Sequence, residues 1–178
     1  MKRLFITLCC LLAATLFAAE PVTIEGVENS YRISEELYRS AQPERNGFTA
    51  LQNMGVRSVL NLREFHKDTR KARHTQLHLM AYPVAAGEVT AADVENCLAL
   101  IAGAPKPVLV HCWHGSDRTG IVVAAYRIVF QNWSVEDAEK EFRDDRFGYH
   151  EFWYGNLRRL LRQTDWSNLR SRLNGKKN

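Results

Sequence analysis

Apolar residues along the chain gather in short runs that are separated by polar turns. The runs at 56–62 (VRSVLNL) and 107–110 are rich in β-branched residues and are typical of buried strands, and the run at 77–84 is a weaker example. Two more runs, at 29–33 and 37–40, flank a polar Ser-Glu-Glu segment and predict a short hairpin. The pattern therefore predicts four to five strands.

Between and after these runs, apolar residues recur with the spacing of helices. The predicted helices cover residues 48–54, 90–102, 119–130 and 150–163, with one more after Ser134. Gly55 is suited to end the first helix, and Thr90 and Ser134 are suited to begin theirs. Asp137 stands where a capping box usually has Glu. The helix at 119–130 is apolar nearly all round, so we expect it to be buried.

Strands that alternate with helices indicate an α/β fold with a largely parallel sheet. We expect a single domain in which a central four- to five-stranded sheet is flanked by helices. The chain has 178 residues, of which 46% are hydrophobic and 25% are charged. This length and composition are sufficient for one domain with a real core.

The first residues have the pattern of a secretory signal peptide. Lys2 and Arg3 precede an almost unbroken apolar stretch at 4–19, which is short for a membrane span. Leu-Phe-Ala at 16–18 offers a small-residue cleavage site. We expect a signal peptide at 1–18, a domain at 19–178 and export to the periplasm or the medium, without stable membrane insertion after cleavage. An uncleaved membrane anchor is the alternative.

Removal of residues 1–18 takes away Lys2 and Arg3 and no acid, so the formal net charge falls from +4 to +2. This small charge argues against nucleic acid as a partner. Cys97 and Cys112 then remain, which is too few for a disulfide framework in a domain of this size. We expect Cys97 to pack in the core, with a redox partnership to Cys112 as the alternative.

The stretch at 108–120 (VLVHCWHGSDRTG) combines a strand, a tight loop and the start of a helix. The loop lies at the carboxyl edge of the sheet, where its amides and the following helix dipole favour an anion. Gly115 gives the loop its conformational freedom, and the same field favours the thiolate of Cys112. Arg118 presents a planar fork suited to two phosphoryl oxygens. These features predict a phosphate-binding loop and covalent phosphoryl transfer.

His111-Cys112, followed after five residues by Arg118-Thr119-Gly120, resembles the signature of the cysteine-dependent protein tyrosine phosphatase superfamily, in its dual-specificity branch. The segments 38–43 (YRSAQP) and 55–63 also resemble exported bacterial members. The likeness covers most of residues 30–160.

The resemblance implies a role for each residue of the motif. Cys112 matches the nucleophile that becomes a phosphocysteine, and Arg118 matches the residue that binds the phosphoryl oxygens. Thr119 matches the hydroxyl that stabilises the leaving thiolate, and His111 matches the imidazole behind the loop. The phosphate-binding loop comprises Trp113, His114, Gly115, Ser116, Asp117 and Arg118. The chemistry requires neither a metal ion nor an organic cofactor.

The general acid departs from the pattern of the family. Related exported members carry an Asp upstream of the cysteine, at the position that is Gly87 here. Three carboxylates are candidates in its place: Glu88, Asp93 and Asp117, which precedes the signature arginine. Protonation by water is a further alternative.

The resemblance implies a phosphorylated protein or a small phosphate ester as the substrate. Residues 63–74 (REFHKDTRKARH) carry five Lys/Arg against two acids, which is either a solvated loop or a site for a multiply phosphorylated molecule. Three functions follow in order: a tyrosine or dual-specificity phosphatase, an inositol phosphate or phosphoinositide phosphatase, and a catalytically weak phosphate-binding module. The sequence leaves the oligomeric state open.

Overall fold

The computed structural model describes residues 18–175. The predicted signal peptide lies outside the described residues, apart from Ala18. Within the described part of the chain, none of the helices combines the length and the hydropathy that a membrane span needs.

A mixed sheet of six strands forms the centre of the domain, in the order β1-β2-β3-β6-β4-β5. The strands are β1 (Glu20–Pro21), β2 (Tyr31–Arg32), β3 (Leu37–Ser40), β4 (Ser58–Asn61), β5 (His78–Ala81) and β6 (Val108–His111). β3, β6, β4 and β5 run parallel, whereas β1, β2 and β3 pair antiparallel. The predicted α/β class is confirmed. The expected number of four to five strands is wrong by one, because the two-residue strand β1 extends the edge of the hairpin.

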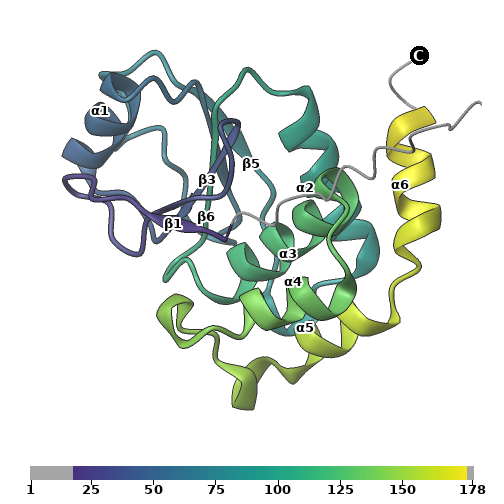
Figure 1. The fold of residues 1–178 in the computed structure, drawn as a ribbon. Helices are drawn as coiled ribbons and strands as arrows, with labels where there is room; N and C mark the ends of the chain where they lie inside the picture. The colour runs from purple at the N-terminus through teal and green to yellow at the C-terminus, as the bar shows by residue number, and fades with distance from the viewer. Residues whose placement is uncertain (1–17, 176–178) are drawn as a thin grey trace, which may run out of the picture.

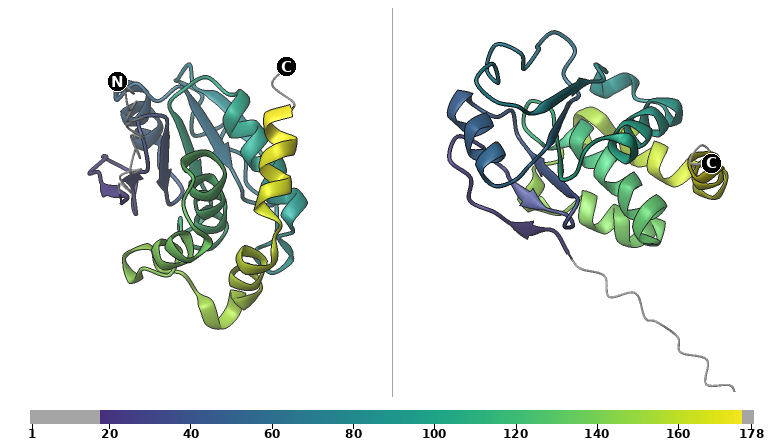
Figure 2. Two further views of the ribbon diagram at one scale, coloured as in Figure 1. Left: turned by 45° about the vertical axis from the view of Figure 1, so that its right-hand side comes forward. Right: turned by 90° about the horizontal axis from the view of Figure 1, so that it is seen from above.

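Helices cover both faces of the sheet. They are α1 (Arg45–Asn53), α2 (Ala91–Gly103), α3 (Asp117–Gln131), α4 (Val135–Phe142), α5 (Glu151–Gln163) and α6 (Trp166–Gly175), with two short 3₁₀ helices, η1 (Ala86–Glu88) and η2 (Asp145–Phe147). α1 lies on one face and the other five α-helices lie on the opposite face (Figures 1 and 2). The central strand β6 shows why: Leu109 packs on the α1 side, and Val108 and Val110 pack on the other.

The helix starts follow the predicted caps in most details. The Thr90 hydroxyl accepts the amide of Asp93, whose carboxylate accepts the amide of Thr90, which is a complete capping box. At α4, the Ser134 hydroxyl accepts the amide of Asp137, but the Asp137 carboxylate accepts that hydroxyl rather than the Ser134 amide. The sequence prediction missed α6.

The phosphate loop lies between the central strand and the most buried helix. β6 has a parallel neighbour on each side, so its carboxyl end, at His111, is in the middle of the carboxyl edge of the sheet. The chain then turns through residues 112–116 and enters α3, which is buried over nearly its whole length as predicted. The loop is thus held between two rigid elements.

Candidate active site

The carbonyl groups of the phosphate loop all point away from its centre, because each accepts a hydrogen bond from the scaffold. The donors are His111 Nδ1 for Cys112 (3.1 Å), the Gln42 amide for Trp113 (3.0 Å), Asn29 Nδ2 for His114 (2.8 Å), Arg39 Nη2 for Gly115 (2.7 Å) and the Gly120 amide for Ser116 (2.8 Å). The amides of residues 113–118 donate to no oxygen in the described chain. Since the carbonyls are turned outward, these amides form a cradle for an anion.

The tight curl of this loop depends on Gly115. Its φ of +75° lies in the left-handed region, and a Cβ at this position would come within 2.5 Å of the backbone of Ser40. The loop therefore packs directly against the end of β3. Any side chain at this position forces the loop away from the sheet.

Four buried polar atoms around the loop have no hydrogen-bond partner in the described chain. They are Nε of Arg118, Oγ1 of Thr119, Nη2 of Arg63 and Nε of Arg39. Buried polar groups without partners are rare, and where they occur at one site they suit a ligand. Three of the four are guanidinium donors, so the ligand they suit is an anion.

Two carbonyls at the carboxyl edge of the sheet hold the guanidinium of Arg118. Its Nη1 donates to the carbonyl of Val84 (3.2 Å) and lies 3.5 Å from that of Leu62. Neither contact uses Nε, so the other edge of the fork is available for bidentate binding of two phosphoryl oxygens. Arg118 also lines the cleft above the loop.

A buried polar chain, which the sequence prediction missed, supports the Cys112 end of the loop from behind. His111 Nε2 lies 2.8 Å from Oδ2 of Asp68, and Oδ1 of Asp68 accepts Nε2 of Gln42 (3.0 Å). Oε1 of Gln42 accepts Nη1 of Arg63 (2.6 Å). Burial alone would raise the pKa of Asp68, but the hydrogen bonds from His111 and Gln42 and the charge of Arg63 hold it below its usual value.

Buried arginines make the surroundings of the loop electropositive. Arg39 lies under the loop, where burial lowers its pKa to about 10, so it is still cationic at pH 7. Burial also lowers the pKa of Arg63, whose guanidinium stacks over the ring of Trp113 at 4.0 Å. A thiolate and a phosphate ester are both stabilised by this field.

A cleft of about 490 Å³ opens above the loop. Its lining residues are Ala86, Trp113, His114, Asp117, Arg118, His150, Trp153 and Tyr154. Trp113 and Trp153 are 52% and 74% exposed, so the mouth of the cleft is aromatic. The basic segment 63–74 borders it, since the His66 ring lies 5.8 Å from that of Trp113.

The three candidate acids lie in different surroundings. Asp117 lines the cleft, and its carboxylate accepts the backbone amide of His150 (2.9 Å) and contacts the His150 ring at 3.0 Å. Glu88 is exposed on η1. The Asp93 carboxylate is occupied by Thr90 and by the Tyr82 hydroxyl (2.8 Å). Asp117 is thus the candidate that faces the cleft.

The two described cysteines are free thiols and differ in their environment. Cys97 packs in the core on α2, as expected, and burial raises its pKa to about 12. Cys112 lies at the bottom of the amide cradle and is 2% exposed.

Residues 27–151 match the tyrosine phosphatase family. The chain belongs to the tyrosine phosphatase family. The resemblance seen in the His111–Gly120 motif is thereby confirmed, and the match covers both the loop and the 38–43 segment beside it.

Known relatives of the family are similar in sequence and in structure. The dual specificity protein phosphatase TpbA of Pseudomonas aeruginosa is 36% identical over 140 residues, which cover 76% of this chain and 63% of that protein. The chain thus spans less than two thirds of this relative's length.

Two solved structures of P. aeruginosa TpbA are 31% identical to this chain. The crystal structure of the protein matches with a TM-score of 0.78, over 88% of this chain and 96% of that one. A cysteine-to-serine variant in complex with phosphotyrosine matches with a TM-score of 0.79, over 88% and 95%. The catalytic core of the PP-IP phosphatase Siw14 from S. cerevisiae shares the fold, with a TM-score of 0.72 at 22% identity over 87% and 96%.

Proposed function

We propose that the protein hydrolyses phosphate monoesters through a phosphocysteine on Cys112. The observation that carries the proposal is the cradle of unpaired amides, together with the unpaired Nε of Arg118, around that thiol. The name of the relative TpbA and its phosphotyrosine complex support phosphotyrosine proteins as substrates. The aromatic mouth formed by Trp113 and Trp153 fits the ring of such a residue.

In the first step, the Cys112 thiolate attacks phosphorus and the bond to the ester oxygen breaks. The amides of residues 113–118 and the guanidinium of Arg118 bind the three other oxygens, over which the charge is spread in the transition state. The leaving oxygen takes a proton from a general acid. We propose Asp117 for this role, because it is the candidate carboxylate that lines the cleft.

In the second step, a water molecule attacks the phosphocysteine. The sulfur–phosphorus bond breaks, inorganic phosphate leaves, and the thiolate is restored. Asp117, now ionised, takes the proton of the water. The buried hydroxyl of Thr119 is placed to donate to the sulfur as it regains its charge.

The test is turnover of an aryl phosphate by Cys112→Ser, with Cys97→Ser as a matched change of the other thiol. We expect the first variant to lose activity by a factor of about 10³ or more and the second to keep it. Mass spectrometry of quenched mixtures should find one phosphoryl group on Cys112. An active Cys112→Ser variant excludes the proposal, and inactivity of the wild-type protein would favour a phosphate-binding module.

The acid is tested with esters whose alcohols differ in acidity. Asp117→Asn should slow a poor leaving group about 10² times or more while a good one is nearly unaffected. Glu88→Gln and Asp93→Asn should not show this difference. Gly87→Asp should speed the poor leaving group, since a Cβ at Gly87 meets no atom within 4 Å and η1 borders the cleft. Equal loss with both esters excludes Asp117 as the donor.

A multiply phosphorylated small molecule is the second candidate substrate, because the basic segment 63–74 lies beside the loop. Its exposed cations are Lys67, Arg70 and Arg73, whereas Lys71 pairs with Glu44 (3.2 Å). Neutralising these three should slow hydrolysis of an inositol polyphosphate and spare an aryl phosphate. The matched control neutralises three exposed cations elsewhere, at Arg45, Arg57 and Lys140. If the triple variant hydrolyses both the inositol polyphosphate and the aryl phosphate at the wild-type rates, this alternative is excluded.

We also propose that the protein is exported to the periplasm or the medium. The support is the sequence pattern at 1–18, with two cations before an apolar stretch and a small residue at its end. Fractionation of cells that express the full chain tests this proposal. If the protein is recovered from the cytosol and still carries residues 1–18, export is excluded.

A further inference from the structure

The chain enters the domain through a residue whose backbone is buried against a charged pair. The main-chain nitrogen of Ala19 donates to Oε1 of Glu141 at 3.0 Å, and Ala19 is only 3% exposed. Arg127 holds the same carboxylate with two hydrogen bonds, Nη2 to Oε1 (2.7 Å) and Nε to Oε2 (2.9 Å). The buried carboxylate of Glu141 thus accepts hydrogen bonds from the main chain as well as from an arginine. The main-chain donor stands directly before the edge strand β1.

We propose that cleavage of the Ala18–Ala19 peptide bond creates a terminal ammonium on Ala19 that pairs with Glu141 and locks the N-terminus in place. A signal peptidase adds one water across that bond, which leaves a carboxylate on Ala18 and an amine on Ala19. The amine takes up a proton at neutral pH, because an α-amino group ionises near pH 8. One weak amide donor becomes a charged group with three donors at the same atom.

The fold marks the same bond as a boundary. Ala18 is exposed, whereas Ala19 is buried, and the Ala19 carbonyl accepts Nη1 of Arg146 (3.1 Å). Both main-chain groups of Ala19 are therefore held, and those of Ala18 contribute nothing to this anchor.

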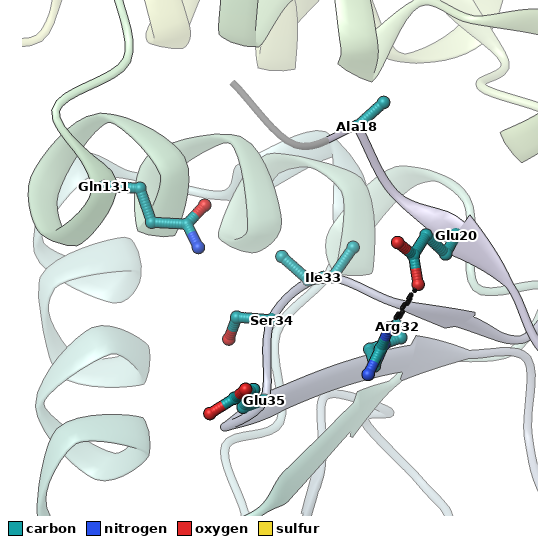
Figure 3. Close-up of a pocket in the computed structure, with 7 residues that line it drawn as sticks. All are labelled: Ala18, Glu20, Arg32, Ile33, Ser34, Glu35 and Gln131. Carbon is teal, nitrogen blue, oxygen red and sulfur yellow. Dashed lines mark hydrogen bonds and ion pairs between the residues drawn. The ribbon is translucent and has the colours of Figure 1, made fainter. Parts of the chain in front are cut away.

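Charged side chains of both signs surround this position. Two pockets flank Ala18, one bordered by the β2–β3 turn and the end of α3, as Figure 3 shows, and one by α4. Their charged lining residues are Glu20, Arg32, Glu35, Asp137, Lys140, Glu141, Asp144 and Arg146. Five of these are acids and three are bases. Glu20 pairs with Arg32 and Asp144 pairs with Arg146, and both Arg127 and Arg39 act on Glu141. Glu141 is therefore the acid that a new cation on Ala19 would contact directly.

The first experiment determines where the exported chain begins. Intact-mass measurement of the protein secreted from the full-length chain should give Ala19 as its first residue. Reaction with an acylating reagent at pH 7, followed by peptide mapping, should modify the Ala19 amine about 10 times or more slowly than the amine of a chain that begins at Ala18. A different first residue, or equal acylation rates, would overturn the proposal.

The second experiment measures coupling between the terminal charge and Glu141. The chain that begins at Ala18 keeps every side chain of the domain, but we expect it to melt about 3 to 6 °C below the chain that begins at Ala19. In the Glu141→Gln background this difference should vanish. In the matched Glu136→Gln background, an exposed change on the same helix, it should persist. A difference that survives Glu141→Gln refutes the pairing, and neither measurement depends on phosphatase activity.

Discussion

Asp68 links the basic segment to His111, which precedes Cys112, and its replacement by Asn tests whether that link supports the site. The carboxylate is buried and accepts two donors, His111 Nε2 (2.8 Å) and Gln42 Nε2 (3.0 Å). Asn has nearly the same shape but only one oxygen, so its NH₂ group must face one of these donors. One buried hydrogen bond to a charged group is lost and one donor is left without an acceptor.

The size of the effect follows from those two losses. A hydrogen bond to a charged group contributes about 1.5–3 kcal/mol, and an unsatisfied buried donor costs about 1–3 kcal/mol. Allowing for local adjustment, we expect Asp68→Asn to lower the free energy of unfolding by about 2–4 kcal/mol. For a chain of this length that is a fall in Tm of about 4 to 16 °C. Because His111 holds the Cys112 carbonyl, kcat on an aryl phosphate should fall as well.

The stabilisation that Asp68 provides depends on pH, and its lowered pKa sets the direction. The hydrogen bonds hold the pKa of Asp68 below its usual value despite burial, so its contribution is fully present above the unfolded value of about 3.9 and is lost as the pH falls through the folded value. Thermal unfolding of wild type and Asp68→Asn should therefore differ most near pH 7 and converge below about pH 4. Glu64→Gln, an exposed change in the same segment, is the control. A gap that is independent of pH would refute the ionic link.

Three further variants and measurements follow from the site. Gly115→Ala should lower the free energy of unfolding by about 2–4 kcal/mol in urea titration, because its Cβ meets the backbone at the end of β3 at 2.5 Å and φ is positive; an unchanged midpoint would contradict this packing. At pH 8, iodoacetamide should modify one thiol per native chain, Cys112, since burial raises the pKa of Cys97 to about 12; two modified thiols in the native protein would show that Cys97 is accessible. Arg63→Ala should raise KM for aryl phosphates several-fold in steady-state assays and reduce the fluorescence change of Trp113 on binding of vanadate, because the guanidinium stacks on that ring; unaltered values of both would place Arg63 outside substrate binding.

Local signals were sufficient to predict most of the fold. The strands at 56–62 and 107–110 and the helix at 90–102 were predictable because their apolar period and their caps are properties of neighbouring residues. The helix at 166–175 was missed although Trp166, Leu169 and Leu173 repeat with helical spacing and are buried. Its many polar residues hide that period, and only packing against α2 and α3 makes it stable.

The contacts that complete the site join residues far apart in the chain, so a local pattern does not contain them. Asp68 stands in a segment with five cations, and the composition of such a segment predicts an exposed acid. In the structure, Asp68 is buried and hydrogen-bonded to His111. The contact of Asp117 with His150 spans 33 positions. Sequence identifies which side chains carry the chemistry, whereas the partners that orient them depend on how the strands and helices pack.

The outward carbonyls explain why the segment 38–43 accompanies the cysteine signature. A loop of five residues has no internal means of turning every carbonyl to the same side, so each needs an external donor. Arg39 and Gln42 supply two of these donors, and β3 brings both to the loop because it pairs in parallel with β6. The signature at 111–120 is therefore only part of the anion site. A chain that kept the signature but lost the Arg39 side chain would leave the Gly115 carbonyl free to turn inward, where it would repel the anion that the amides suit.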